Sequence, residues 1–156
     1  MKVTLPVFGI DIDETSVLVF QDATSKHDAL DALVDAVSDT GFIEDKEAFR
    51  GAVHDRERVL STGIGQGVAI PHVRIDAVTQ PTLGIGVSAS GIDFDTLDDA
   101  PVHVVFMFAM PTGSQKAYLS LLSKVMQAVK TPDFNDRLTA CATPGEVLEV
   151  LSEPGS

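Results

Sequence analysis

The sequence predicts an α/β fold in which a mixed, mostly buried β-sheet is flanked by helices. Segments with apolar residues at helical spacing alternate along the chain with short apolar runs that are typical of strands. In addition, residues 102–109 are apolar on both faces of an extended chain except at His103. That pattern indicates a central strand covered on both sides. Helices on the two faces of one sheet would account for both observations.

The first part of the chain predicts one strand and two helices. Residues 16–20 predict a short strand. Ser25 is a suitable N-cap, and Asp28 three positions later makes a weaker form of the capping box. Apolar residues at helical spacing then predict a helix that ends near Asp39. A second helix is expected over about residues 45–56.

The second part predicts three strands and two helices. We expect strands over residues 68–70, 82–88 and 101–110. Residues 115–130 have a helical apolar face. A capping box with proline at its first helical position opens a final short helix near residue 144. The order of the strands cannot be deduced from these patterns.

Length and charge restrict the class of protein. A chain of 156 residues fits one domain, expected over residues 1–152, with a frayed tail at 153–156. Eleven basic and 23 acidic side chains give 11 − 23 = −12. Such a surface argues against binding a nucleic-acid backbone and favours a partner with a locally positive face.

Cysteine content and hydropathy indicate the compartment. The one cysteine, Cys141, excludes a disulfide within the chain and argues against a zinc site built on thiolates. The N-terminal segment lacks the features of a signal peptide, and no apolar run approaches the roughly 20 residues needed to cross a bilayer. We therefore expect a soluble cytoplasmic protein with no cofactor and no metal site.

A glycine-rich segment is the first candidate for chemistry. Glycines alternate with other residues between positions 61 and 67, which frees the backbone for turns with positive φ. Successive amides in such turns can bind an anion, and hydroxyl groups add further donors. The segment is neither a P-loop nor a dinucleotide fingerprint, and an ordinary strand connection is the alternative. The candidate phosphate ligands in it are Ser61, Thr62, Gly63, Gly65 and Gly67.

His72 is the candidate nucleophile. Pro71 stiffens the chain directly before it. Imidazole is nucleophilic near neutral pH, and one ring nitrogen can be held by a hydrogen bond while the other reacts. Arg56, at the end of the preceding helix, could contact phosphate oxygens through two donors. The alternatives are a structural or solvated histidine, and a helix-end arginine that only pairs with the helix dipole.

Other candidates are assigned structural roles. We expect His27 to be solvated and His103 to be a hydrogen-bonded residue at the edge of the core. His54 lies two residues before Arg56 and could border the site, but a surface histidine stabilised by the helix dipole is favoured. Cys141 is expected to be a small buried residue. The acidic residues 93–99 lack metal-loop spacing and predict a solvated loop.

Together these residues closely resemble the signature of the fructose/mannitol/nitrogen-type enzyme IIA domains of the bacterial phosphoenolpyruvate-dependent sugar phosphotransferase system. The family pattern is Arg-Glu, a few residues, and then Ser-Thr-Gly-Ile-Gly-X-Gly-hydrophobic-Ala-Ile-Pro-His. The resemblance covers nearly the whole chain, and its motif is highly specific. The matching positions are Arg56, Glu57, Ser61, Thr62, Gly63, Ile64, Gly65, Gly67, Ala69, Ile70, Pro71 and His72.

The resemblance implies a phosphoryl carrier with an enzyme IIA type-2 fold. His72 would accept a phosphoryl group from the phosphorylated histidine phosphocarrier HPr, on Nε2, and donate it to a cysteine of an enzyme IIB domain. Arg56 would steady the phosphohistidine. For such transfer, we expect His72 to be accessible in a shallow depression ringed by apolar residues.

The sequence departs from the family at one position. Many members have a second active-site histidine where this chain has Tyr118. A phenol can donate a hydrogen bond to phosphate, but its pKa of about 10 prevents it from shuttling a proton near neutral pH. A tyrosine that only packs in the core is the alternative.

Two roles within the family, and one outside phosphoryl transfer, remain open. The family serves sugar uptake, with IIB and membrane IIC partners, and a nitrogen-type regulatory branch that controls target proteins by binding. A chain without fused IIB, IIC or HPr domains favours the regulatory branch. The alternative is a IIA-like binding module that no longer transfers phosphate, which Tyr118 leaves open and Arg56 with His72 disfavours.

Overall fold

The structure is a computed structural model that describes residues 2–5, 10–22, 24–59, 63–65, 67–94, 100–131 and 133–152. The strands are β1 (Lys2–Leu5), β2 (Ile10–Asp13), β3 (Val17–Phe20), β4 (Gly63–Gly65), β5 (Val68–Ala69), β6 (His72–Arg74), β7 (Thr82–Ile92) and β8 (Val102–Met110). The helices are a short 3₁₀ turn η1 (Glu14–Ser16), α1 (Lys26–Ser38), α2 (Lys46–Val59), α3 (Gln115–Lys130), α4 (Phe134–Thr139) and α5 (Pro144–Ser152).

The central sheet is mixed, as the sequence predicts. Its strands follow the order β3-β7-β8-β5-β4, and β6 also pairs with β8. Strands β7 and β8 are antiparallel, whereas β3 runs parallel to β7, and β5 and β6 run parallel to β8. Strands β1 and β2 form a separate two-stranded antiparallel sheet.

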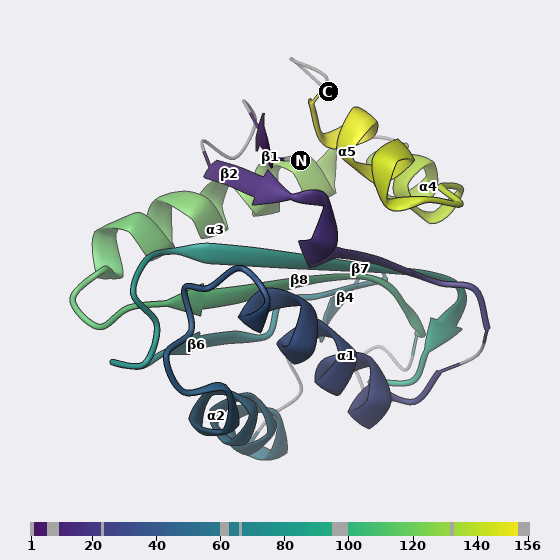
Figure 1. Ribbon diagram of the computed structural model, residues 1–156. Coiled ribbons are helices and arrows are strands. Elements are labelled where there is room, and N and C mark those ends of the chain that lie inside the picture. Colours follow the sequence, from purple (N-terminus) through teal and green to yellow (C-terminus); the bar gives the residue numbers. More distant parts are fainter. Residues whose placement is uncertain are drawn as a thin grey trace.

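Helices cover both faces of this sheet, with α1 and α2 on one face and α3, α4 and α5 on the other (Figure 1). Strand β8 supplies both cores because successive side chains of a strand point to opposite faces. Val104, Phe106 and Phe108 pack with α3, α4 and α5, whereas Val105 and Met107 pack with α1 and α2. All five side chains are fully buried. This confirms the predicted central strand with two covered faces.

Two glycines of β7 set how closely α1 approaches the sheet. A Cβ at Gly84 would lie 2.5 Å from Cγ2 of Val37, and a Cβ at Gly86 would lie 3.2 Å from Cδ1 of Leu33. Both contacts are tighter than ordinary van der Waals packing. The absence of side chains at these positions therefore lets α1 lie directly on β7.

Helix α2 is fixed to α1 at one end by an ion pair. Nζ of Lys26, at the start of α1, lies 2.7 Å from Oε1 of the buried Glu57, in the last turns of α2. The same ammonium donates a hydrogen bond to the carbonyl of Phe94 at 3.2 Å. Helix α2 also packs against β6. These contacts hold the C-terminal end of α2 beside the sheet.

Most predicted helices are confirmed, and Ser25 is the N-cap of α1, its Oγ accepting a hydrogen bond from the Asp28 amide at 3.1 Å. Four features of the strands differ from the expectation. Strand β7 extends four residues beyond 88, to Ile92, and the chain forms β6 after Pro71 instead of stopping there. The pair β1–β2 and the short strand β4 in the glycine-rich segment were not expected. The expected tail at 153–156 lies outside the described residues.

Candidate functional site

Pro71 separates two short strands that share one register on β8. Val68 in β5 pairs with Val104, and His72 in β6 pairs with Phe108, so the offset is 36 residues in both strands (104 − 68 and 108 − 72). Proline has no N–H for the ladder, but its carbonyl accepts a hydrogen bond from the Phe108 amide at 2.8 Å. The interruption therefore leaves His72 at the first position of a strand that is still held by the central sheet.

The imidazole of His72 is oriented by one hydrogen bond. Its Nδ1 lies 2.9 Å from the carbonyl oxygen of Ile70. A carbonyl can only accept, so Nδ1 is the protonated nitrogen and Nε2 has the free lone pair. Among the described residues, none hydrogen-bonds to Nε2. The ring is half-buried, and the residues before it, Ile70 and Pro71, are buried.

Tyr118, in the first turn of α3, lies directly against this ring. The two rings are stacked, with centroids 5.3 Å apart and an interplanar angle of 26°. The tyrosine also makes an edge contact with Phe108, at 5.9 Å between centroids. Burial raises the pKa of the Tyr118 hydroxyl, and the positive charges of Arg74 and Arg56 oppose that shift. The phenol is therefore protonated at neutral pH and can act as a donor.

Two arginines place positive charge at this site. Arg56 lies in the last turns of α2, and its charge acts on Tyr118. Arg74 follows His72 by two positions on β6, and its Cζ lies 6.0 Å from the centroid of the Tyr118 ring. Sequence reasoning identified Arg56 but missed Arg74. The alternation of a strand, in which residues i and i+2 share a face, is the signal that could have found it.

The N-terminal end of α3 adds to the positive potential. Tyr118 belongs to the first turn of that helix, so its stacking on His72 places the helix start beside the imidazole. No acidic residue lies in the first turn of α3. The partial positive charge of a helix N-terminus favours an anion there.

The glycine-rich segment is only partly described. Gly63 and Gly65 lie in β4, which pairs with β5 in an irregular antiparallel register. Gly67 has a φ of +76°, and its carbonyl accepts hydrogen bonds from the amides of His103 and Val104. Ser61 and Thr62 lie outside the described residues, so their role as phosphate ligands stays a prediction.

The structural roles expected for His103 and Cys141 are confirmed. His103 is half-buried, and its Nδ1 donates to the carbonyl of Ser88 at 2.8 Å. Cys141 is 9% exposed, its Sγ lies 3.3 Å from the carbonyl of Arg137, and burial raises the pKa of the thiol. The acidic loop falls partly at residues 95–99, outside the described residues.

The expectation for His54 is wrong. Its side chain is only 15% exposed, and its Nε2 hydrogen-bonds to Oδ1 of Asp31 on α1 at 2.7 Å. His27 is exposed, as expected, yet its ring stacks on that of His54, with 4.6 Å between centroids. The contact between the two histidines depends on the packing of α1 on α2. Local sequence patterns do not show that packing, so sequence reasoning treated the two residues separately.

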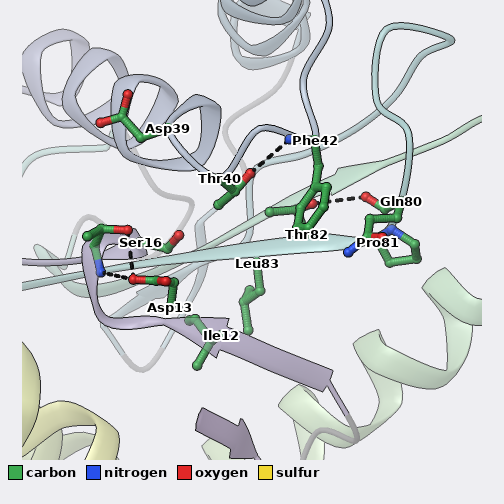
Figure 2. A pocket seen from close by; sticks show the side chains of 11 residues that line it. Ile12, Asp13, Ser16, Asp39, Thr40, Phe42, Gln80, Pro81, Thr82 and Leu83 are labelled. Atoms are coloured by element: carbon green, nitrogen blue, oxygen red, sulfur yellow. Dashed lines mark hydrogen bonds between the residues drawn. The ribbon is translucent and has the colours of Figure 1, made fainter. Parts of the chain in front are cut away.

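A pocket lies beside β2, the 3₁₀ turn and the start of β7, and not at His72. It has a volume of about 130 Å³ and opens between the end of α1, the 3₁₀ turn and the start of β7 (Figure 2). Ser16 in its wall is 1% exposed, and its hydroxyl has no hydrogen-bond partner among the described residues. None of the predicted site residues lines this pocket. The depression expected around His72 stays a prediction.

Solved structures define the class of fold. The crystal structure of the nitrogen regulatory protein IIA-Ntr from Neisseria meningitidis has a TM-score of 0.81 with 24% identity, covering 90% of this chain and 95% of that one. IIA of the Escherichia coli mannitol system, solved in complex with phosphorylated IIB, has a TM-score of 0.76 with 19% identity, covering 90% and 96%. The fold is that of the IIA domains of sugar phosphotransferase systems.

The sequence then identifies the family. Residues 12–153 match the family described as "Phosphoenolpyruvate-dependent sugar phosphotransferase system, EIIA 2", and this chain belongs to it. The fructose-specific EIIA component of Haloferax volcanii is 35% identical over 129 residues, which is 83% of this chain and 84% of that protein. The nitrogen regulatory protein of Klebsiella oxytoca is 35% identical over 106 residues, 67% and 65% of the two chains. Family membership makes the chain a phosphotransferase component of the phosphoryl-carrier type.

Within the part of the chain that the structure describes, no helix is both long and apolar enough to span a membrane.

Proposed function

We propose that this protein carries a phosphoryl group on Nε2 of His72, accepting it from phosphorylated HPr and donating it to a cysteine of an enzyme IIB domain. The observation behind this proposal is the hydrogen bond from Nδ1 of His72 to the Ile70 carbonyl. That bond fixes the tautomer and leaves the Nε2 lone pair for attack. The single carrier domain, proposed over residues 1–152, would work in the cytoplasm, where HPr and IIB domains meet.

Each transfer is a displacement at phosphorus. In the first, the Nε2 lone pair of His72 forms the new N–P bond, while the electron pair of the donor's N–P bond returns to the donor imidazole. Because Nδ1 keeps its proton, the phosphorylated ring is positively charged, which makes it a good leaving group. In the second, a cysteine thiolate of IIB forms the S–P bond, and the N–P pair returns to Nε2.

Positive groups around His72 would stabilise the charge on the transferred phosphoryl group. In this proposal Arg56 contacts its oxygens, the Tyr118 hydroxyl donates a hydrogen bond, and the start of α3 contributes its partial charge. Glu57 holds the end of α2 through Lys26, and so positions Arg56. The amides and hydroxyls of Ser61, Thr62, Gly63, Gly65 and Gly67 would complete the phosphate site.

The role in the cell belongs to one of two branches. The relatives include a protein named fructose-specific EIIA and a protein named nitrogen regulatory protein. We propose that the chain serves either sugar uptake through IIB or regulation of a target protein that distinguishes the two phosphorylation states. Release of phosphate to a cysteine-containing IIB domain, but not to its Cys→Ser variant, would support the first branch.

Intact mass spectrometry after incubation with phosphoenolpyruvate, enzyme I and HPr tests the proposal. We expect the mass gain of one acid-labile phosphoryl group. The variant His72→Gln should show no gain, whereas His103→Gln, at a structural histidine, should keep it.

Two outcomes would contradict the proposal. A mass gain that persists in His72→Gln would refute His72 as the phosphorylated residue. No gain in the unmodified chain, with HPr shown to be phosphorylated in the same tube, would favour a binding module that does not transfer phosphate.

A further inference from the structure

We propose that His27, Asp31 and His54 form a binding site for one divalent transition-metal ion of the zinc type, which would link α1 to α2. One potential ligand atom from each of the three side chains lies within 4.8 Å of the other two. These residues lie outside the phosphoryl-carrier site, and the sequence predicted no metal site. Two imidazoles and one carboxylate are a common ligand set for zinc and for other divalent first-row transition metals.

The geometry comes from two helices. His27 and Asp31 are one turn apart on α1, so they share a face of that helix. Nε2 of His27 lies 3.3 Å from Oδ2 of Asp31, and Nε2 of His54, on α2, lies 2.7 Å from Oδ1. Ligand atoms around a tetrahedral zinc ion are about 3.3 Å apart, given bond lengths near 2.0–2.1 Å. Small side-chain rotations would therefore suffice to enclose an ion.

The protonation states suit a cation. The hydrogen bond from His54 holds the pKa of Asp31 below its usual range, with a further contribution from Arg50, so Asp31 is an anion at neutral pH. Metal binding requires an unprotonated ring nitrogen on each imidazole. The proton now shared between His54 and Asp31 would move to the other ring nitrogen or be released to solvent.

Arg50 is the group that opposes a bound cation, because it lies 2.9 Å from Oδ1 of Asp31. Its guanidinium is also paired with Asp35 at 2.7 Å and with Glu47 at 3.1 Å, and Lys46 pairs with Asp35 at 2.9 Å. The three carboxylates Asp31, Asp35 and Glu47 outnumber the two cations, so the local charge is 2 − 3 = −1. Arg50 also fixes the orientation of the Asp31 carboxylate, as outer-shell partners of metal ligands do.

A bound ion would stiffen the pair of helices. His54 is two residues before Arg56, and the His27 end of α1 adjoins the Lys26–Glu57 ion pair. An ion that binds only the folded chain stabilises it in proportion to its affinity. The ion would thus reinforce the connection between α1 and α2 that the His54–Asp31 and Arg50–Asp31 contacts already make.

Isothermal titration of the untagged protein with ZnCl₂ at neutral pH tests the proposal. We expect one ion per chain at micromolar affinity, and a rise in melting temperature of about 5–10 °C at a hundredfold excess over Kd. The variants His27→Gln and His54→Gln should each lose at least about 100-fold in affinity, since they remove ligands and not outer-shell partners. Co²⁺ should give a visible absorption band in the wild type that both variants lack.

The controls separate this site from other histidines and from misfolding. His72→Gln should bind zinc like the wild type, and loss of binding in that variant would overturn the assignment. His27 is 70% exposed, so its replacement leaves the fold intact even if the largely buried His54 does not tolerate change. Absence of zinc binding in the wild type, or unchanged affinity in His27→Gln, would refute the proposal.

Discussion

The pKa of the Tyr118 hydroxyl reports on the charge around His72. The chain has one tyrosine and no tryptophan, so an absorbance titration of the phenol can be assigned to this residue. Burial raises the pKa of its hydroxyl, and Arg74 and Arg56 act in the opposite direction. The resemblance to the family predicts that this phenol stands where many members have a second histidine. A phenol that stays protonated can hydrogen-bond to a phosphoryl group at any pH where the carrier works, but it cannot relay a proton.

We predict that absorbance titration of Tyr118 gives a pKa above its ordinary value, and that Arg74→Gln raises it further because a nearby cation is lost. Arg56→Gln should also raise it, whereas Arg137→Gln, in α4, whose charge acts on Cys141, should leave it unchanged. An unchanged pKa in Arg56→Gln would place that guanidinium too far away to serve the site. Because the pKa of Tyr118 is higher in the folded than in the unfolded state, its contribution to the free energy of unfolding is present below a pH of about 10 and is lost as pH rises further.

The individual residues of the site differ in how well sequence predicts them. His72, Arg56 and the glycines lie within 17 positions of one another and form a recognisable motif. Tyr118 is 46 positions from His72 (118 − 72), and only the packing of α3 brings the rings together. The pairing of His27 with His54 has the same origin, since it depends on the contact of α1 with α2.

At the scale of the elements, the contact between α1 and β7 depends on the absence of side chains at Gly84 and Gly86. A methyl group at Gly84 would overlap Val37, and the neighbouring Val37 and Leu33 side chains are already fully buried. Close-packed interiors cannot absorb such an addition without shifting backbone or side chains. The helix would have to move away from the strand.

We predict that Gly84→Ala destabilises the fold by about 1–3 kcal/mol, the usual cost of overpacking. Gly51→Ala is the matched control, because a Cβ at Gly51 in α2 has no neighbour within 4 Å. That change should stabilise the protein by up to about 1 kcal/mol through helix propensity. Urea unfolding measures both. Equal effects of the two substitutions would show that α1 does not lie against β7 as described.

Local patterns predicted the helices and the buried strand β8 because those signals are periodic and extend over many residues. The extension of β7 and the strand β6 were missed because both depend on pairing with β8. Beyond Ser88, β7 continues through the small residues Ala89, Ser90 and Gly91 to the buried Ile92, and such small residues are typical of a loop. The hairpin of β1 and β2 is short, and its pairing is likewise a property of the folded chain.

For the whole molecule, the net charge of −12 creates repulsion that the folded state must overcome. Salt screens this repulsion, because the Debye length falls from about 30 Å at 0.01 M to about 10 Å at 0.1 M ionic strength. Local ion pairs such as Lys26–Glu57 are short and partly buried, so screening affects them less.

We predict that the melting temperature rises by a few degrees between 0.01 M and 0.5 M NaCl. For a chain of this size, a gain of about 1 kcal/mol in the free energy of unfolding corresponds to roughly 2–4 °C. Calorimetry or thermal circular dichroism provides the measurement. An equal osmolality of an uncharged solute serves as the control. A melting temperature that falls with salt would show that favourable ion pairs outweigh the overall repulsion.

The two faces of β8 can change independently. Phe106 and Phe108 contact the layer that contains Tyr118, whereas Val105 and Met107 contact the layer that contains the two paired histidines. Substitutions in separate cores have nearly additive effects on stability. Substitutions on one face of β8 can therefore alter the packing of α3, α4 and α5 while leaving α1 and α2 unaltered, and the reverse also holds.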